Sequence, residues 1–491
     1  MATTADRLTA LVDVKDKLVH NLEVQGQVPQ NKTFSELVDM PFDPMYDTDD
    51  GIYMVDGFPI DLATWTEPGS MSLIYSNAFE GIINLQVGTT SGNYRVIVND
   101  GVNDISNTTY ARGTQANISV TKGNGDVYYA IKISPAVAGQ SLTYCRYVKP
   151  TSFPMTYYNI GLILAYINTD TFTTLYSAFN HAGSTKSPLF WKFYIKSTKN
   201  VTEMTYMCYD CRGLKVISCP NFDTSKVTTF SYCFYQCNLL KSVPMTMTTN
   251  IATDVGGLFN ACYSLRKIPD LVFREDVAVN FSTTFASCYS LEVFPTRMNT
   301  SKSTSLDNTF SSCYHLRKVP EGFSSDNATT LNGTFLMAVN LIELPNLNTS
   351  KVTNMNNVFN GARNLKKLPV FSDYTKVTAM NGFLTDTIGI VEPYTLDLST
   401  CLTTLTMFVS TTANSLRGLI VNPLGTWTGT SPQIDIYSSG LDRTALVALF
   451  NSLGTVTGKT IRITNSLGAS SLTAADLLIA TNKGWTVNKT T

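Results

Sequence analysis

Residues 349–369 read TSKVTNMNNVFNGARNLKKLP, and this stretch decides the fold because close copies of it recur along the chain. Each copy has a Phe, a small residue three positions later, a Leu at six, an apolar residue at nine and a Pro at ten. Complete copies are anchored at Phe234, Phe259, Phe285, Phe310, Phe335 and Phe359. Weaker copies are anchored at Cys208, Phe383 and Phe408, so the period is 24 to 26 residues.

A repeat of this length cannot bury its own apolar face, so neighbouring copies must stack around a shared interior. The sequence predicts a mainly β solenoid with short helices. We expect a strand at the Leu-x-x-apolar segment, as at residues 365–368, and a helical turn before the Phe, as at residues 354–359. The Pro then ends the strand. Successive strands are expected to stack about 4.8 Å apart.

The cysteines share one position of the repeat, three residues after the anchor. Cys-x-x-Cys and Cys-x-x-x-Cys pairs, such as Cys208/Cys211 and Cys233/Cys237, are typical of zinc or redox sites. Later copies have Ala in the same position, however, and Ala replaces Cys only where a small buried residue is needed. We therefore predict a row of buried free thiols and no metal site. The repeat positions concerned hold Cys211, Cys237, Cys262, Cys288, Cys313, Ala338 and Ala362.

With these residues in place, the array resembles the BspA-like leucine-rich repeats, whose pattern is close to TSKVTNMxxMFxxCxxLxxIP. The resemblance covers roughly residues 200–430. It implies a curved, right-handed β solenoid with a binding or scaffold role and no chemistry. Such repeats occur in bacterial surface adhesins and in bacteriophage virion proteins.

The flanking regions differ from the array. Alternating or β-branched segments between Gly, Asn and Asp turns predict a small β-sandwich over residues 46–150. Residues 151–207 form a predicted transition and first coil, and the solenoid is expected over 208–431. Residues 432–491 are predicted to cap the stack with strands at 433–437, 459–464 and 485–487 and helices after residue 441 and after the Thr473/Asp476 capping box.

Residues 1–45 are predicted to be a helical attachment or oligomerisation segment, because residues 5–23 carry an apolar helical stripe. This segment is similar to N-terminal pieces of phage fibre and baseplate proteins. The alternative is that the stripe packs on its own domain. Charged residues near the start break any export signal, and no apolar run reaches the roughly 20 residues that a membrane span needs.

Composition and motifs argue against most other classes. The formal net charge is -1, which gives no basic excess for nucleic acid. No GxGxxG, Walker A, HExxH or GxSxG motif occurs, so we predict neither enzyme activity nor a cofactor. A glycan depolymerase would need paired carboxylates on one face, whereas the acidic residues of the array are sparse and irregular. The run at residues 47–51 resembles the start of a calcium loop but lacks its final Glu.

Exposed positions of the repeat predict a ligand surface. We expect a basic stripe beside a row of tyrosines, which would suit an anionic glycan. The alternative is that the cations only keep a solvent-facing sheet soluble and the tyrosines pack coil to coil. The basic residues are Lys215, Lys241, Arg266, Lys267, Arg317, Lys318, Lys366 and Lys367, and the tyrosines are Tyr209, Tyr263, Tyr289 and Tyr314.

The leading functional hypothesis is a bacteriophage virion protein, a head or tail fibre or a baseplate-attached adhesin. Its N-terminal region would bind other virion proteins, and its solenoid would bind a host-surface glycan or protein. A homotrimer is expected, in the virion, with no nucleic acid bound and no membrane insertion. The alternative is an adhesin on the bacterial cell surface.

Overall fold

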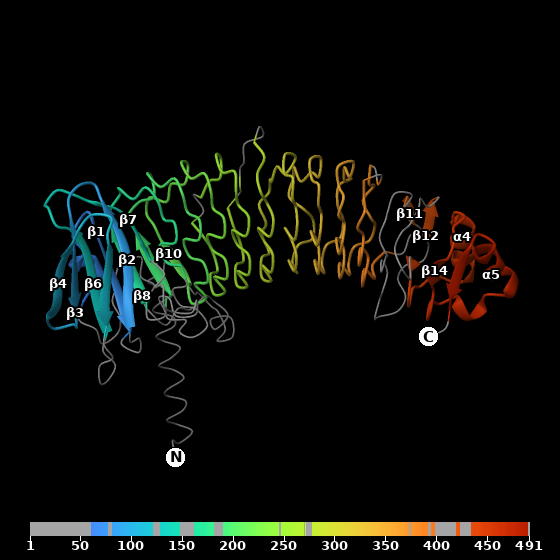
Figure 1. Cartoon of the computed structure of the whole chain (residues 1–491), viewed down its shortest axis with the longest axis horizontal. Helices are drawn as coiled ribbons and strands as arrows, with labels where there is room; N and C mark the ends of the chain where they lie inside the picture. Colours follow the sequence, from blue (N-terminus) through green and yellow to red (C-terminus); the bar gives the residue numbers. More distant parts are fainter. Residues whose placement is uncertain are drawn as a thin grey trace, which may run out of the picture.

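The computed structural model describes residues 60–76, 81–120, 128–147, 162–180, 190–244, 247–269, 271, 277–372, 374, 376–390, 394–397, 419–422 and 434–489. The predicted attachment segment at residues 1–45 and the turn at residues 47–51 lie outside these ranges. Figure 1 shows an elongated molecule with a β-sandwich at one end, a solenoid of stacked coils in the middle and a small αβ unit at the other end. The predicted mainly β fold with a solenoid is confirmed.

The sandwich has two antiparallel sheets with a shared apolar interior. Inner-face residues such as Leu73, Val96 and Ile131 are almost fully buried, and they alternate with more exposed neighbours along β3. One sheet contains β1 (Ser70–Ser76), β3 (Tyr94–Asn99), β4 (Asp104–Tyr110) and β6 (Tyr128–Pro135). The other contains β2 (Gly81–Thr89), β5 (Gln115–Val120) and β7 (Leu142–Tyr147). Alternation in the sequence predicts strands at residues 71–75, 81–87, 93–98, 117–121, 127–133 and 142–148, which locates all of these strands except β4.

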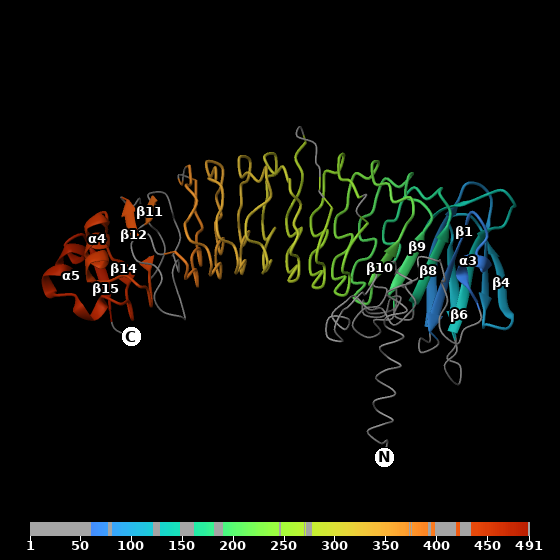
Figure 2. The ribbon, with the colours of Figure 1, turned by 180° about the vertical axis from the view of Figure 1, so that it is seen from behind.

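The first sheet continues into the solenoid. Strand β1 pairs antiparallel with β8 (Leu162–Asn168), and then β9 (Lys192–Ile195) and β10 (Val216–Ser218) add in parallel. The predicted division at residue 150 therefore falls between two strands of one seven-stranded sheet. The short helix α3 (Leu62–Trp65) lies against the outer face of this sheet, as Figure 2 shows from behind. There Leu62 belongs to one apolar cluster with Ile74 and Leu164.

The coils after β10 are made of turns instead of strands and helices. In the coil around Phe234, the N–H groups of Phe230, Tyr232 and Phe234 donate to carbonyls of the next coil at 2.8–2.9 Å. Between them, the Cys233 N–H donates to the Phe230 carbonyl three residues back, and the Ser231 N–H donates to the Thr229 hydroxyl. The expected helical turn at 354–359 and the expected strand at 365–368 are therefore both wrong: the first is a series of turns, and the second is irregular backbone.

Two left-handed residues in each coil produce this alternation. One lies two residues before the anchor and the other two residues after it, as in Asn308 (φ 51°) and Ser312 (φ 57°) on either side of Phe310. A right-handed helix cannot include residues with positive φ, so these positions send alternate N–H groups towards the neighbouring coil. The repeated Asn and Gly at the first position were the sequence signal for this conformation.

The anchor rings fill the interior in one column. Neighbouring rings from Phe234 to Phe359 are stacked with centroids 5.6–6.2 Å apart and planes within 15° of parallel. Beside them, Thr284, Thr309 and Thr334 are fully buried, and the hydroxyl of each donates to the carbonyl three residues back. The same hydroxyl hydrogen is shared with a carbonyl of the preceding coil. The interior is thus apolar with its few hydroxyls satisfied by backbone.

The C-terminal unit agrees with its sequence prediction. Asp442 caps α4 (Arg443–Ser452), and Thr473 and Asp476 form the expected capping box of α5 (Ala474–Thr481). Gly484 is left-handed (φ 84°) immediately before the last strand. Its parallel sheet contains β13 (Ile434–Asp435), β14 (Lys459–Arg462) and β15 (Trp485–Asn488), and the 3-10 helix η2 spans Ala469–Ser471. A separate parallel pair, β11 (Tyr394–Asp397) and β12 (Leu419–Asn422), comes before this unit.

Candidate functional site

The predicted tyrosine row is a stack along the solenoid. The rings of Tyr263 and Tyr289 are 4.7 Å apart with planes at 6°, and those of Tyr289 and Tyr314 are 5.0 Å apart with planes at 5°. Both faces of the Tyr289 ring are therefore covered by other tyrosines. A sugar ring cannot stack on it, so this row offers edges and hydroxyl groups to a ligand. The coil-to-coil packing considered as the alternative is what the geometry shows.

Tyr209 does not belong to this row, which corrects the sequence assignment. Its ring stacks on Tyr235 at 4.5 Å and lies edge-on to Tyr206 and Tyr232. With Tyr176 these residues make up the tyrosine cluster, a group of five half-buried rings on the first coils. Sequence reasoning missed the cluster, although a signal was present: tyrosines recur 26 residues apart at 206/232 and at 209/235.

Lys215 is half-buried, and the other basic residues are exposed and aligned, but they do not form one stripe. The Arg266 N–H donates to the Lys241 carbonyl at 3.1 Å, and the next coil brings Glu292 to the same place, with its N–H 3.0 Å from the Arg266 carbonyl. A later coil brings in Ile342, which is 40% exposed. The predicted stripe is therefore three basic patches: Lys241 with Arg266 and Lys267, Arg317 with Lys318, and Lys366 with Lys367.

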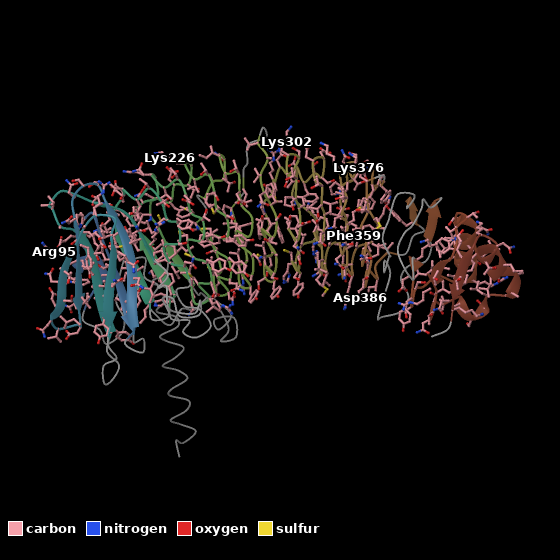
Figure 3. All side chains as sticks on the ribbon, in the orientation of Figure 1. Arg95, Lys226, Lys302, Phe359, Lys376 and Asp386 are labelled. Carbon is pink, nitrogen blue, oxygen red and sulfur yellow. The ribbon has the colours of Figure 1, made fainter. Side chains whose placement is uncertain are left out.

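A second row of cations lies along one long edge of the solenoid. Figure 3 shows Lys226, Lys302 and Lys376 along one long edge and Asp386 at the other. Lys351 has the same place in its coil, and all four lysines are exposed. Two of them reach back to an asparagine of the preceding coil, Lys226 to Asn200 at 3.2 Å and Lys351 to Asn327 at 2.5 Å. We call these four residues the lysine row.

The predicted core residues lie in the solenoid interior. All six anchors and the thiols of Cys237, Cys262, Cys288 and Cys313 are at most 1% exposed. Each thiol also donates to a carbonyl of the preceding coil, as from Cys288 to Phe259 at 3.1 Å. Burial raises the pKa of these thiols above their ordinary value of 9.0. The thiols are therefore buried, hydrogen-bonded and held in the protonated form, and they fill space in the interior. Nucleophilic and metal chemistry require the thiolate, which this environment disfavours.

The described residues carry no arrangement typical of catalysis. No group of three His, Cys, Asp or Glu side chains lies close enough in the described ranges to hold a metal ion. The described carboxylates Glu292, Asp307 and Glu321 occupy three different positions of the coil, so they do not align along the solenoid. In the same part of the chain, no helix is long and apolar enough to cross a bilayer.

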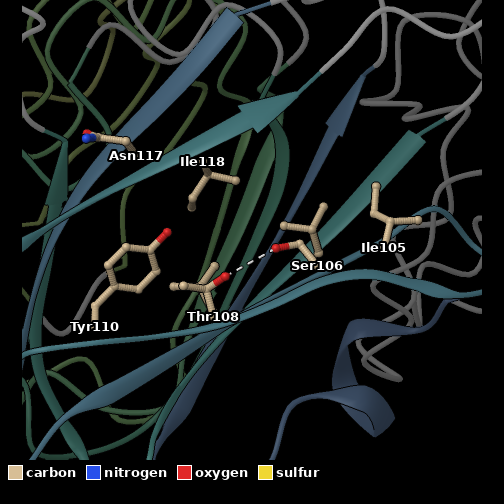
Figure 4. A pocket seen from close by; sticks show the side chains of 8 residues that line it. Ile105, Ser106, Thr108, Tyr110, Asn117 and Ile118 are labelled. Carbon is tan, nitrogen blue, oxygen red and sulfur yellow. Dashed lines mark hydrogen bonds between the residues drawn. The ribbon is translucent and has the colours of Figure 1, made fainter.

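The sandwich has a hollow of about 330 Å³ beside its edge strand β4. Val96, Val98 and Ile118 form its apolar floor, and its rim includes Ser106 and Thr108, whose hydroxyl oxygens are 3.5 Å apart (Figure 4). No charged side chain lines it. The hollow can hold a small uncharged group, and its polar lining consists of the hydroxyls of Ser106, Thr108 and Tyr110 and the amide of Asn117. Strand β4 escaped prediction because it is exposed on both faces and lacks apolar alternation.

Comparison with known families gives one match along the array. Residues 162–272 and 279–396 match the family described as "Mycoplasma protein of unknown function, DUF285". The solenoid fits a BspA-like repeat protein. The match begins at β8, so the repeat region includes the coils that continue the sandwich sheet. No curated protein and no solved structure matches the chain.

Proposed function

We propose that this chain is a bacteriophage virion protein, part of a head or tail fibre or attached to the baseplate, whose solenoid binds the host envelope. The observation that carries the binding role is the recurrence of exposed basic pairs in every second coil, at Arg266/Lys267, Arg317/Lys318 and Lys366/Lys367. Patches repeated along one axis suit a polymer with regularly spaced anionic groups. The likeness of the N-terminal segment to phage fibre pieces supports a place in the virion, with a homotrimer as the assembly.

The family match favours a second candidate, an adhesin on the bacterial cell surface, because the matching family is described from Mycoplasma. The binding role of the solenoid is the same in both. Immunogold electron microscopy separates the two, since antibodies against the chain would label either phage particles or cell surfaces. Label on cells without phage would overturn the virion proposal.

The binding role is tested by reversing charge in the basic patches. The triple variant Lys267→Glu, Lys318→Glu, Lys367→Glu should lose most of its binding to bacterial envelope fractions, and added salt should weaken the wild type. The matched control reverses three charges of the lysine row, Lys226→Glu, Lys302→Glu and Lys376→Glu. It makes the same change in net charge at residues outside the basic patches. Equal binding by the wild type and the first variant would discard the basic patches as the binding surface.

A further inference from the structure

Two adjacent coils have a tyrosine where the backbone favours a much smaller residue. Tyr206 (φ 55°) and Tyr232 (φ 51°) occupy the left-handed position two residues before the anchor. A bulky side chain is strained in this conformation, because its Cβ lies too close to the backbone carbonyl oxygen. The other coils have Ser177, Gly257, Thr283, Asn308, Gly333, Asn357 and Gly382 at this position. In the last of these coils Leu384 has the anchor's place, one residue after the Phe383 expected from the sequence. The backbone therefore does not require the two tyrosines, and strained residues of this kind are typical of functional sites.

The two strained rings are the centre of the tyrosine cluster. Tyr206 stacks on Tyr232 at 5.7 Å and meets the edge of Tyr176 at 6.2 Å. The Tyr209–Tyr235 stack lies beside them, with Tyr232 and Tyr235 edge to face at 5.6 Å. Since all five rings are half-buried, they form a rigid surface that is apolar in its body and polar at its edges.

The adjoining polar groups form a neutral set. Arg212 Nε donates to Asp210 Oδ1 at 2.6 Å, and its guanidinium also donates to Gln236 Oε1 at 2.9 Å. The charges of Arg212 and Asp210 cancel, in contrast to the basic patches. The set therefore combines donors, acceptors and aromatic rims, and sugar hydroxyl groups act as both donors and acceptors. Tyrosines supply such contact area at a low cost in conformational entropy.

We propose that the tyrosine cluster, with Asp210, Arg212 and Gln236, is a binding site for a neutral oligosaccharide. The neutral charge of the set disfavours an anionic ligand here, and the polar rim distinguishes the surface from a purely apolar protein contact. The site goes beyond the proposed envelope-binding function, because it lies on the first coils and requires none of the basic patches.

The experiment uses the full chain and saturation-transfer NMR. The probes are tetrasaccharides of glucose, galactose and N-acetylglucosamine, with a galacturonate tetrasaccharide as the charged comparison. A neutral tetrasaccharide should bind, and the double variant Tyr206→Asn, Tyr232→Asn should weaken its affinity by about ten-fold or more. Asparagine suits the left-handed backbone, as at Asn308 and Asn357, so the Tm of the variant should be unchanged or higher.

The control variant is Thr283→Asn, which introduces the same residue at the left-handed position of another coil and should leave tetrasaccharide binding intact. The proposal is overturned if no neutral tetrasaccharide binds, if the double variant binds as the wild type does, or if the galacturonate probe binds better than the neutral ones. Because the double variant keeps the basic patches, failure of this site and failure of envelope binding by those patches are distinguishable.

Discussion

In the sandwich, strands of six to nine residues satisfy the backbone through long antiparallel ladders, whereas the coils of the solenoid do so through single bridges and tight turns. Both regions nevertheless contribute to one continuous apolar cluster. The sandwich thus depends on alternation along each strand. The solenoid depends on the same side chain returning to the same place in every coil, so a single substitution affects three neighbouring coils.

The largest expected effect tests that dependence. Phe285→Ala removes a ring stacked between Phe259 and Phe310 and should lower the free energy of unfolding by about 3–5 kcal/mol. Urea unfolding followed by circular dichroism measures it. Val96→Ala in the sandwich removes fewer buried carbons and should cost less. If the two losses were equal, the column of rings would not be the main support of the coils.

The next largest effect is a loss of stability at alkaline pH, which the buried thiols should cause in both regions. The raised pKa of the buried thiols means that they stabilise the fold fully below pH 9.0, the ordinary value, and that this stability is lost as pH rises, because only the unfolded chain releases the protons. Each fully buried thiol contributes a slope of up to ~1.4 kcal/mol per pH unit. Cys288→Ala, which mimics Ala338, should remove one such slope in urea unfolding from about pH 8 to about pH 10.

The sandwich has a comparison thiol, Cys145, whose pKa burial raises to about 12. Cys145→Ala should flatten the pH dependence by a similar amount, and the double variant with Cys288→Ala should flatten it by the sum. A pH dependence that is identical in the wild type and both variants would show that these thiols ionise in the folded chain.

The smallest effect concerns left-handed glycines. Gly257 and Gly139 both have positive φ (64° and 80°), so Ala should cost about 1 kcal/mol at each from the backbone alone. In the solenoid, a Cβ on Gly257 would also lie 2.5 Å from the Tyr232 ring, whereas nothing lies within 4 Å of one on Gly139. Gly257→Ala should therefore lower Tm more than Gly139→Ala in paired thermal melts. The reverse order would contradict the close packing of successive coils.

The sequence predicted those features that follow from the polarity and size of individual side chains. The Phe, Cys and Leu spacing located the solenoid, and the Thr473/Asp476 pattern located the last helix to within its cap. Alternation located the apolar strands of the sandwich. It could not locate β4, because Ser106, Thr108 and their neighbours lie at an open edge where neither face needs apolar residues.

For the candidate site, the sequence identified rows of exposed residues but could not place them relative to one another. It joined Lys241, Arg266 and Arg317 into one stripe, because it did not take account of Glu292 in the coil between them. It also assigned Tyr209 to the wrong row. Tyr209 lies one residue after its anchor Cys208, whereas Tyr263 lies four residues after its anchor Phe259.

The sequence by itself determined that equivalent residues share one interior, because a repeat of about 25 residues has no other way to bury its apolar positions. Only the tertiary structure decided how the backbone achieves this. The left-handed residues direct alternate N–H groups between coils, and the hydrogen bonds that result have no trace in hydrophobic periodicity. The tyrosine cluster also exists only in three dimensions, because its rings come from separate coils and are brought together by the stacking.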